Sequence, residues 1–271
     1  MLPDLHTSIR DLSTEIAIKS RAKAVRITSQ AKSSHIASCF SVIDILSVLF
    51  TMKQASNSHS KDDIILSKGH AAAGLYAVLH SLGLLNSDLD DFCKDNSKIY
   101  GHINHLASSH ISLSTGSLGH GLPFGVGIAL ANKLKKSNSK VFVVISDGEL
   151  NEGTTWESAL FAGHHSLSNL VVVIDRNRIQ SLGFTEDTLK LDPIDEKWQS
   201  FGWNTVEIDG HNYGEILDAA ILETTKPLCV VANTIKGKGV TYMENTIEWH
   251  YKSANEDELK DAINQIERGL S

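Results

Sequence analysis

Three short runs of apolar, largely β-branched residues constrain the fold of this 271-residue chain more than any other feature. Their sequences are VFVVIS at 141–146, LVVVID at 170–175 and LCVVAN at 228–233. Runs without alternating polar residues are typical of strands that are covered on both faces. Because the segment 154–165 between the first two has a helical pattern, the chain predicts βαβ units and a parallel sheet.

The remaining elements follow from the spacing of apolar residues. We expect an α/β fold in three layers, a mainly parallel sheet covered by helices on both faces. No linker or internal repeat interrupts it, so we expect a single domain over 1–271, with a C-terminal helical extension over about 252–271. The further predicted elements are a short strand over 63–66 and helices over 5–29, 41–50 and 71–82.

Composition excludes several classes of protein. A hydrophobic fraction of 41% supports a substantial core, whereas the formal charge of -7 argues against a broad nucleic-acid surface. The few basic clusters are short, and we interpret them as solvated; they are Lys133, Lys135 and Lys136, and Lys236 and Lys238.

The cysteines and the hydropathy pattern predict a cytoplasmic protein. Cys39, Cys93 and Cys229 are odd in number and form no CxxC pair, which favours free thiols in a reducing compartment. The N-terminal residues mix charged and apolar side chains, unlike a signal peptide. No run approaches the roughly 18 apolar residues of a membrane span, so we expect no membrane partner.

Polar and glycine-rich segments follow the three apolar runs, where ligands bind in parallel sheets. Asp147 and Asn177 each lie just past a strand, and 177 − 147 = 30 residues separate them. Each alone is an ordinary turn residue. Together, with the backbone carbonyl of Ile179, their oxygens can converge on Mg²⁺ or Ca²⁺.

The segment GSLGHG, Gly116 to Gly121, precedes a helical pattern. Glycines let the backbone approach a ligand closely, and a helix start favours an anion such as a diphosphate. The order of the glycines differs from the dinucleotide fingerprint, and no Lys-Ser or Lys-Thr follows, which excludes a P-loop. The residues alone therefore lead to a Mg²⁺-diphosphate site without defining its chemistry.

Several of the 13 histidines lie beside glycine or other small residues. One such histidine is more often structural, but several in one cleft would suit proton transfer and hydrogen bonding to a polyhydroxylated substrate. The candidates are His35, His70, His102, His120 and His250, while His164 and His165 are interpreted as structural. Glu149 and Glu157 are explained as acidic residues that stabilise a helix start.

Motifs along most of the chain resemble the N-terminal, thiamine diphosphate-binding region of transketolase. They are SSHIAS, LSKGHA, GHINH, STGSLGHGL, SDGELNEGTTWES, DRNRIQ, DGH and KGKGV. The 30-residue spacing is similar to that of the thiamine diphosphate motif, which begins GDG and ends in Asn. In length the chain resembles the N-terminal subunit of a split, two-chain transketolase.

The resemblance implies a role for each matching residue. Asp147, Asn177 and the Ile179 carbonyl would hold Mg²⁺, for which Ca²⁺ or Mn²⁺ can substitute. The implied cofactor-binding residues are His70, Gly116, Ser117, Leu118, Gly148, Glu149 and Asn177. His35, His102 and His250 would touch the sugar hydroxyls and move protons, and Glu152 would join a carboxylate network between paired cofactor sites.

The implied reaction is ketol transfer, in which the cofactor ring is an electron sink and a two-carbon unit passes from a ketose to an aldose, phosphorylated or not. The resemblance also implies a second subunit with the pyrimidine-binding and C-terminal domains, most simply in an α₂β₂ assembly. The alternatives are a subunit of another thiamine diphosphate enzyme, such as one resembling deoxyxylulose-phosphate synthase or acting on an unusual or activated sugar, or a non-catalytic cofactor-binding module. A nicotinamide-dependent dehydrogenase is the least favoured hypothesis.

This sequence departs from the family pattern at four places. Ser146 replaces the first glycine of the cofactor motif, and Ile36 and Ala37 replace the Pro-Gly that usually follows the histidine. Tyr251 follows His250 where many relatives have glycine. The change to Ser146 is mild; we expect Ile36 and Ala37 to alter the donor end of the site, and Tyr251 to alter the loop of His250.

Overall fold

The sheet contains the three predicted strands together with the short one over 63–66. A computed structural model describes residues 3–55, 59 and 61–269. In that part of the chain five strands pair in the order β1-β2-β3-β5-β4, and every pairing is parallel. The strands are β1 (Asp63–Leu66), β2 (Val141–Ser146), β3 (Leu170–Arg176), β4 (Asn204–Asp209) and β5 (Leu228–Asn233).

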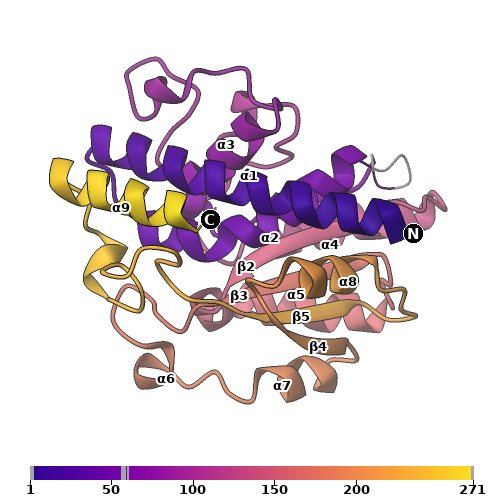
Figure 1. Ribbon diagram of the computed structural model, residues 1–271. Coiled ribbons are helices and arrows are strands. Elements are labelled where there is room, and N and C mark those ends of the chain that lie inside the picture. Colours follow the sequence, from indigo (N-terminus) through magenta and orange to yellow (C-terminus); the bar gives the residue numbers. More distant parts are fainter. Residues whose placement is uncertain (1–2, 56–58, 60, 270–271) are drawn as a thin grey trace.

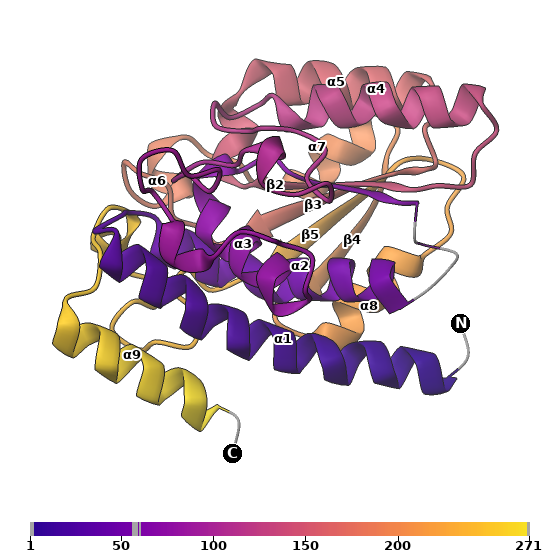
Figure 2. The ribbon, with the colours of Figure 1, turned by 90° about the horizontal axis from the view of Figure 1, so that it is seen from above.

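Alternate side chains of the strands enter two separate hydrophobic cores. Phe142 and Val144 of β2 join one core, whereas Val141, Val143 and Ile145 join the other. Figure 2 shows α4, α5 and α7 on one side of the sheet and α1, α2, α3 and α8 on the opposite side. The predicted three-layer α/β fold is therefore confirmed, and it explains why the strand sequences are apolar throughout.

The helices agree with the expected ones in position; those predicted over 5–29 and 41–50 are longer than expected, and the one predicted over 71–82 is shorter. The first layer contains α1 (Pro3–Gln30), α2 (Ile36–Ala55), α3 (Ala72–Ser81) and α8 (Tyr213–Ile221), with α9 (Glu256–Arg268) packed beside α1 (Figure 1). The second layer contains α4 (Gly121–Leu134), α5 (Gly153–His164) and α7 (Ile194–Ser200), and α6 (Thr185–Thr188) is a single turn. The tail predicted to be helical contains α9, which begins with a capping box formed by Asn255 and Glu258.

Helix α2 spans 20 residues, although the apolar pattern predicted a helix over 41–50 only. Within the described residues it is the one helix long and apolar enough to cross a membrane, and 94% of that apolar window is buried inside the protein. Its neighbours α1, α3 and α8 surround it, so its hydrophobicity is accounted for by packing. Its first residues, Ile36 and Ala37, are fully buried and leave His35 at the helix entrance.

Candidate active site

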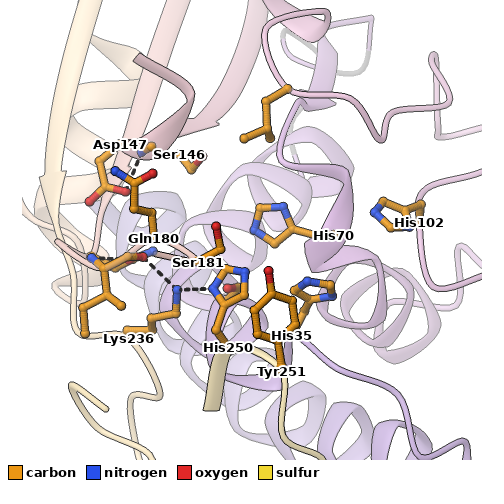
Figure 3. Close-up of a pocket in the computed structure, with 15 residues that line it drawn as sticks. His35, His70, His102, Ser146, Asp147, Gln180, Ser181, Lys236, His250 and Tyr251 are labelled. Carbon is orange, nitrogen blue, oxygen red and sulfur yellow. Dashed lines mark hydrogen bonds between the residues drawn. The ribbon is translucent and has the colours of Figure 1, made fainter. Parts of the chain in front are cut away.

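A cavity of about 220 Å³ lies at the carboxyl edge of the sheet, where the segments after β2, β3 and β5 meet (Figure 3). The register that pairs Ser146 with Asp175 places the residues after these two strands side by side. The lining residues come from segments far apart in sequence; they are His35, Ser38, His70, His102, Leu118, Ser146, Asp147, Gly148, Asn177, Ile179, Gln180, Ser181, Lys236, His250 and Tyr251.

The three predicted metal ligands line this one cavity. One carboxylate oxygen of Asp147, Oδ2, accepts a hydrogen bond from the N–H of Arg178 at 2.5 Å, and the other accepts one from Gly148 at 2.8 Å. Asn177 Oδ1 accepts one from the N–H of Ile179 at 3.2 Å. Burial raises the pKa of the Asp147 carboxyl, and the nearby Asp175 raises it further. A bound cation would oppose both effects and favour the charged carboxylate.

No group of three or more His, Cys, Asp or Glu residues suited to a metal ion occurs among the described residues. The predicted set contains only one carboxylate, with an amide and a carbonyl. Such a set suits Mg²⁺ or Ca²⁺ only when phosphate oxygens or water complete the shell. The magnesium assignment therefore stays a prediction.

Lys236 lies inside the cavity, and its interpretation as a solvated side chain was wrong. Its side chain is 1% exposed, and Nζ donates a hydrogen bond to the carbonyl of Ile179 at 2.8 Å and lies 2.9 Å from Nδ1 of His250. Burial lowers the pKa of its ammonium group, as does the second buried lysine, Lys68. An ammonium group thus contacts the carbonyl that was predicted to bind a cation.

Two lining residues carry buried polar atoms that have no hydrogen-bond partner within the described part of the chain. They are Ser38 Oγ and Gln180 Nε2. Unsatisfied buried polar atoms are rare in native proteins and call for an explanation such as a bound ligand. Together with the ammonium of Lys236, they provide the donors that a phosphate group needs. The sequence reasoning missed Ser38 and Gln180, although both lie within quoted motifs, SSHIAS and DRNRIQ.

Four of the candidate histidines gather at the other side of the cavity. The ring of His35 lies 5.2 Å from that of His70, 5.1 Å from that of His250 and 6.2 Å from that of His102. Burial, together with the neighbouring histidines and lysines, lowers the pKa of His35 to about 4 and that of His250 to about 3. These two rings are therefore neutral at pH 7, so each can donate one hydrogen bond and accept another.

The remaining histidines lie outside the cavity. His120 is exposed at the start of α4. His164 ends α5, and the ring of His165 lies 4.3 Å from that of Phe161. Within the candidate set, the chain brings together only those histidines that the resemblance assigned to the site.

The loop before α4 contributes one side chain to the cavity, that of Leu118. Gly116 lies against His102, since a β-carbon added to it would be 3.6 Å from Cδ2 of that ring. Ser117 is exposed and does not line the cavity. Glu152 is exposed outside the cavity, and its role between paired sites stays a prediction.

Glu149 does not line the cavity; it lies in the first turn of a 3-10 helix, Gly148–Asn151, as the helix-start interpretation expected. Its carboxylate is fully buried and accepts hydrogen bonds from Ser67 Oγ, from the N–H of Gly119 at 2.8 Å and from the N–H of Ser146 at 3.4 Å. It therefore joins the ends of β1 and β2 to the glycine-rich loop. Its contribution is to position the segments that line the cavity.

Comparison with known proteins identifies the family. The profile of the family described as "Transketolase, thiamine diphosphate binding domain" matches residues 12–268. The chain is 37% identical to a subunit of apulose-4-phosphate transketolase from Actinobacillus succinogenes, over 92% of this chain and 95% of that protein. It is 33% identical to 6-deoxy-6-sulfo-D-fructose transketolase subunit SqwG of Clostridium sp., over 86% of this chain and 88% of that protein.

Solved structures agree with this assignment. The chain superimposes on transketolase from Campylobacter jejuni with a TM-score of 0.83 and 27% identity, covering 96% of this chain and 43% of that one. It thus spans less than half the length of that transketolase, but nearly the full length of the two relatives named as subunits. The chain belongs to the transketolase family of transferases, whose thiamine diphosphate-binding domain it contains, and it is similar over nearly its whole length to the N-terminal subunits of split transketolases.

Proposed function

We propose that this chain binds thiamine diphosphate with Mg²⁺, or with Ca²⁺ or Mn²⁺ in its place, and acts as one subunit of a transketolase. The assembled enzyme would transfer a two-carbon ketol unit from a ketose or ketose phosphate to an aldose or aldose phosphate. The observation that carries this proposal is the two-sided cavity. Groups suited to binding a phosphate lie at one side, and the rings of four histidines lie at the other.

The residues at the sheet edge would hold the cofactor. Asp147, Asn177 and the carbonyl of Ile179 would bind the metal ion, and Ser38 and Lys236 would donate hydrogen bonds to the diphosphate. When bound, thiamine diphosphate supplies an electron sink for cleavage of the bond beside the ketose carbonyl. The protein need not provide a nucleophile of its own.

The histidines would bind the sugar and move protons. A neutral imidazole accepts a proton from a hydroxyl group at one nitrogen while the other nitrogen donates a hydrogen bond. His35 and His250 are both held neutral, and their rings are 5.1 Å apart, so one hydroxylated carbon chain could contact both. His70 and His102 extend this surface.

We further propose that a second subunit supplies the pyrimidine-binding and C-terminal domains, most simply in an α₂β₂ assembly with cofactors at the interfaces. This proposal is supported by relatives of similar length that are themselves named as transketolase subunits, and by transketolases that are more than twice as long. A cytoplasmic location is likewise a proposal, since only the composition and the three free cysteines favour it.

The test is to prepare the chain with and without the partner subunit and to titrate thiamine diphosphate and Mg²⁺ into each. A suitable donor panel is xylulose 5-phosphate, fructose 6-phosphate and sedoheptulose 7-phosphate, the sugars named for complexes of the Pichia stipitis transketolase. We expect transfer only from the complex. Full transfer by the isolated chain would refute the division of the site, and cofactor binding without transfer would favour a non-catalytic module.

The metal site has its own test. Asp147→Ala should abolish metal-dependent cofactor binding, while the far-ultraviolet circular dichroism spectrum is unchanged. Asp90→Ala, at an exposed position outside the cavity, is the matched control and should bind as the unchanged protein does. Unchanged binding by Asp147→Ala would show that the ligand assignment is wrong.

A further inference from the structure

Tyr251 stands at the histidine side of the cavity. It lines the cavity although 64% of its surface is exposed. Its ring lies 4.8 Å from that of His250 and 5.9 Å from that of His35, the two rings proposed to bind the sugar. Figure 3 shows its side chain beside both histidines, with the hydroxyl directed toward the side of the cavity where His70 lies. Tyr251 therefore presents a large surface to any molecule that these histidines hold.

The backbone beneath Tyr251 is fixed from both sides. The N–H of His35 donates a hydrogen bond to the carbonyl of His250 at 3.0 Å, and the N–H of Tyr251 donates one to the carbonyl of Glu248 at 3.3 Å. Trp249, two residues before Tyr251, is 4% exposed, and the ammonium group of Lys252 lies 4.5 Å from the centre of its ring. The backbone that carries the ring is thus held in place, and because a tyrosine side chain has only two χ angles, it loses little conformational entropy when it contacts a ligand.

The chemistry of a phenol ring matches that of a sugar chain. Tyrosine combines an apolar face with a polar hydroxyl, and it is favoured where one side of a contact is apolar and the other is wet. A ketose chain likewise alternates C–H bonds with hydroxyl groups. Because Tyr251 lies beside the rings of His250 and His35 and is largely exposed, its partner would be the part of the substrate that lies away from the buried phosphate-binding groups.

We propose that Tyr251 is a specificity-determining residue that binds the carbon chain of the ketose donor beyond the transferred two-carbon unit. This inference rests on the proposed function and adds to it a preference for polyhydroxylated donors over short keto acids. The ring packs against the C–H bonds of the chain, and the phenol hydroxyl bonds to one of its hydroxyl groups.

The test compares two donors with the complete enzyme, including its partner subunit. Fructose 6-phosphate has a long chain beyond the transferred unit, whereas hydroxypyruvate has only a carboxylate there. Tyr251→Ala should raise KM for fructose 6-phosphate about tenfold, the effect expected when roughly one ring contact is lost. Its kcat, and both constants for hydroxypyruvate, should stay within about twofold. Tyr251→Phe should retain most of the affinity, because it keeps the ring.

A binding measurement completes the test without turnover. A fructose 6-phosphate analogue whose C2 carbonyl is reduced to an alcohol cannot react with the cofactor, so calorimetry reports its affinity alone. Tyr251→Ala should weaken that affinity about tenfold. Tyr100→Ala is the matched control, since Tyr100 is 47% exposed and does not line the cavity.

The outcomes separate this inference from the proposed function. Equal changes for both donors, or unchanged affinity for the analogue, would overturn the role of Tyr251 while leaving ketol transfer intact. If the unchanged complex transferred no ketol unit, the proposed function would fail. The role of Tyr251 would then be decided by binding of the analogue alone. Weaker binding by Tyr251→Ala would still support the contact, whereas equal binding by both proteins, or no binding to either, would overturn it.

Discussion

Replacing Glu149 with glutamine should loosen the segments around the cavity without removing any group that faces it. In the native protein Oε1 accepts from Ser67 Oγ and from the N–H of Gly119, and Oε2 accepts from the N–H of Ser146. A glutamine side chain keeps the shape but must turn its NH₂ group toward one of the two backbone donors. That donor is then buried and unsatisfied, which costs about 1–3 kcal/mol.

The expected loss in the free energy of unfolding is therefore about 1–3 kcal/mol for Glu149→Gln. Glu149→Ala removes the acceptor from both backbone N–H groups, so roughly 2–6 kcal/mol is expected for that variant. Cofactor affinity should also fall in both variants, because Leu118, which lines the cavity, directly precedes Gly119. Saturating thiamine diphosphate should recover part of the lost stability in both variants, because a ligand that binds only the folded protein stabilises it by mass action.

Urea denaturation followed by tryptophan fluorescence measures the stability, and a thiamine diphosphate titration measures the affinity. Glu157→Gln is the matched control, because Glu157 is exposed on α5 and should change stability by less than about 0.5 kcal/mol. The reasoning would be refuted if Glu149→Gln were as stable as the unchanged protein yet failed to bind the cofactor. That result would make Glu149 a direct cofactor contact.

Two further predictions concern buried charges. Lys68→Met should destabilise the protein by about 3–5 kcal/mol in urea denaturation, because the carboxylate of Asp175 would lose its buried partner. Adding Asp175→Asn to this variant should recover part of the loss. If the losses of the two single variants simply added in the double variant, the pairing would be contradicted. Burial alone would raise the pKa of Asp44, but Arg21 and His211 outweigh it and hold the pKa below its usual range. The stability that Asp44 contributes is therefore present above its unfolded pKa of about 4 and is lost as the pH falls. Asp44→Asn should be less stable than the unchanged protein at neutral pH, and it should lose less stability between about pH 5 and 3. Parallel curves of stability against pH for the two proteins would show that Asp44 is not the titrating group.

The sheet was predictable because its strands carry their own signature. β2, β3 and β5 are buried on both faces, so their apolar runs coincide with the strands as observed. β4 was missed because it lies at the sheet edge, where its side chains are partly exposed and the sequence NTVEID mixes polar with apolar residues. Helix α2 was predicted too short, since a helix buried on all sides has no polar face to mark its limits.

The site was predictable in outline for a related reason. In a parallel sheet, residues that follow neighbouring strands must meet, so Asp147 and Asn177 could be placed together from their positions alone. The histidines could not be placed this way, because His35, His102 and His250 lie in segments outside the strand order, and only the resemblance grouped them. Glu149 does lie in the first turn of a short helix, as its sequence position indicated, but its hydrogen bonds to Ser67 and Gly119 could not be predicted because these partners are distant in sequence.

Lys236 shows what composition cannot reveal, and why its position matters. A buried ammonium group is costly unless a charge or several hydrogen bonds compensate it. Lys68 meets this requirement through the carboxylate of Asp175, whereas Lys236 contacts a carbonyl oxygen and an imidazole nitrogen, which are both uncharged at neutral pH. Its positive charge is therefore only partly compensated by the more distant Asp147 and Asp175, and burial together with Lys68 lowers its pKa to about 7. It also faces a cavity that contains an unsatisfied hydroxyl group. An anion bound there would satisfy both groups at once, which is the strongest physical reason to expect a phosphate group at this end of the cavity.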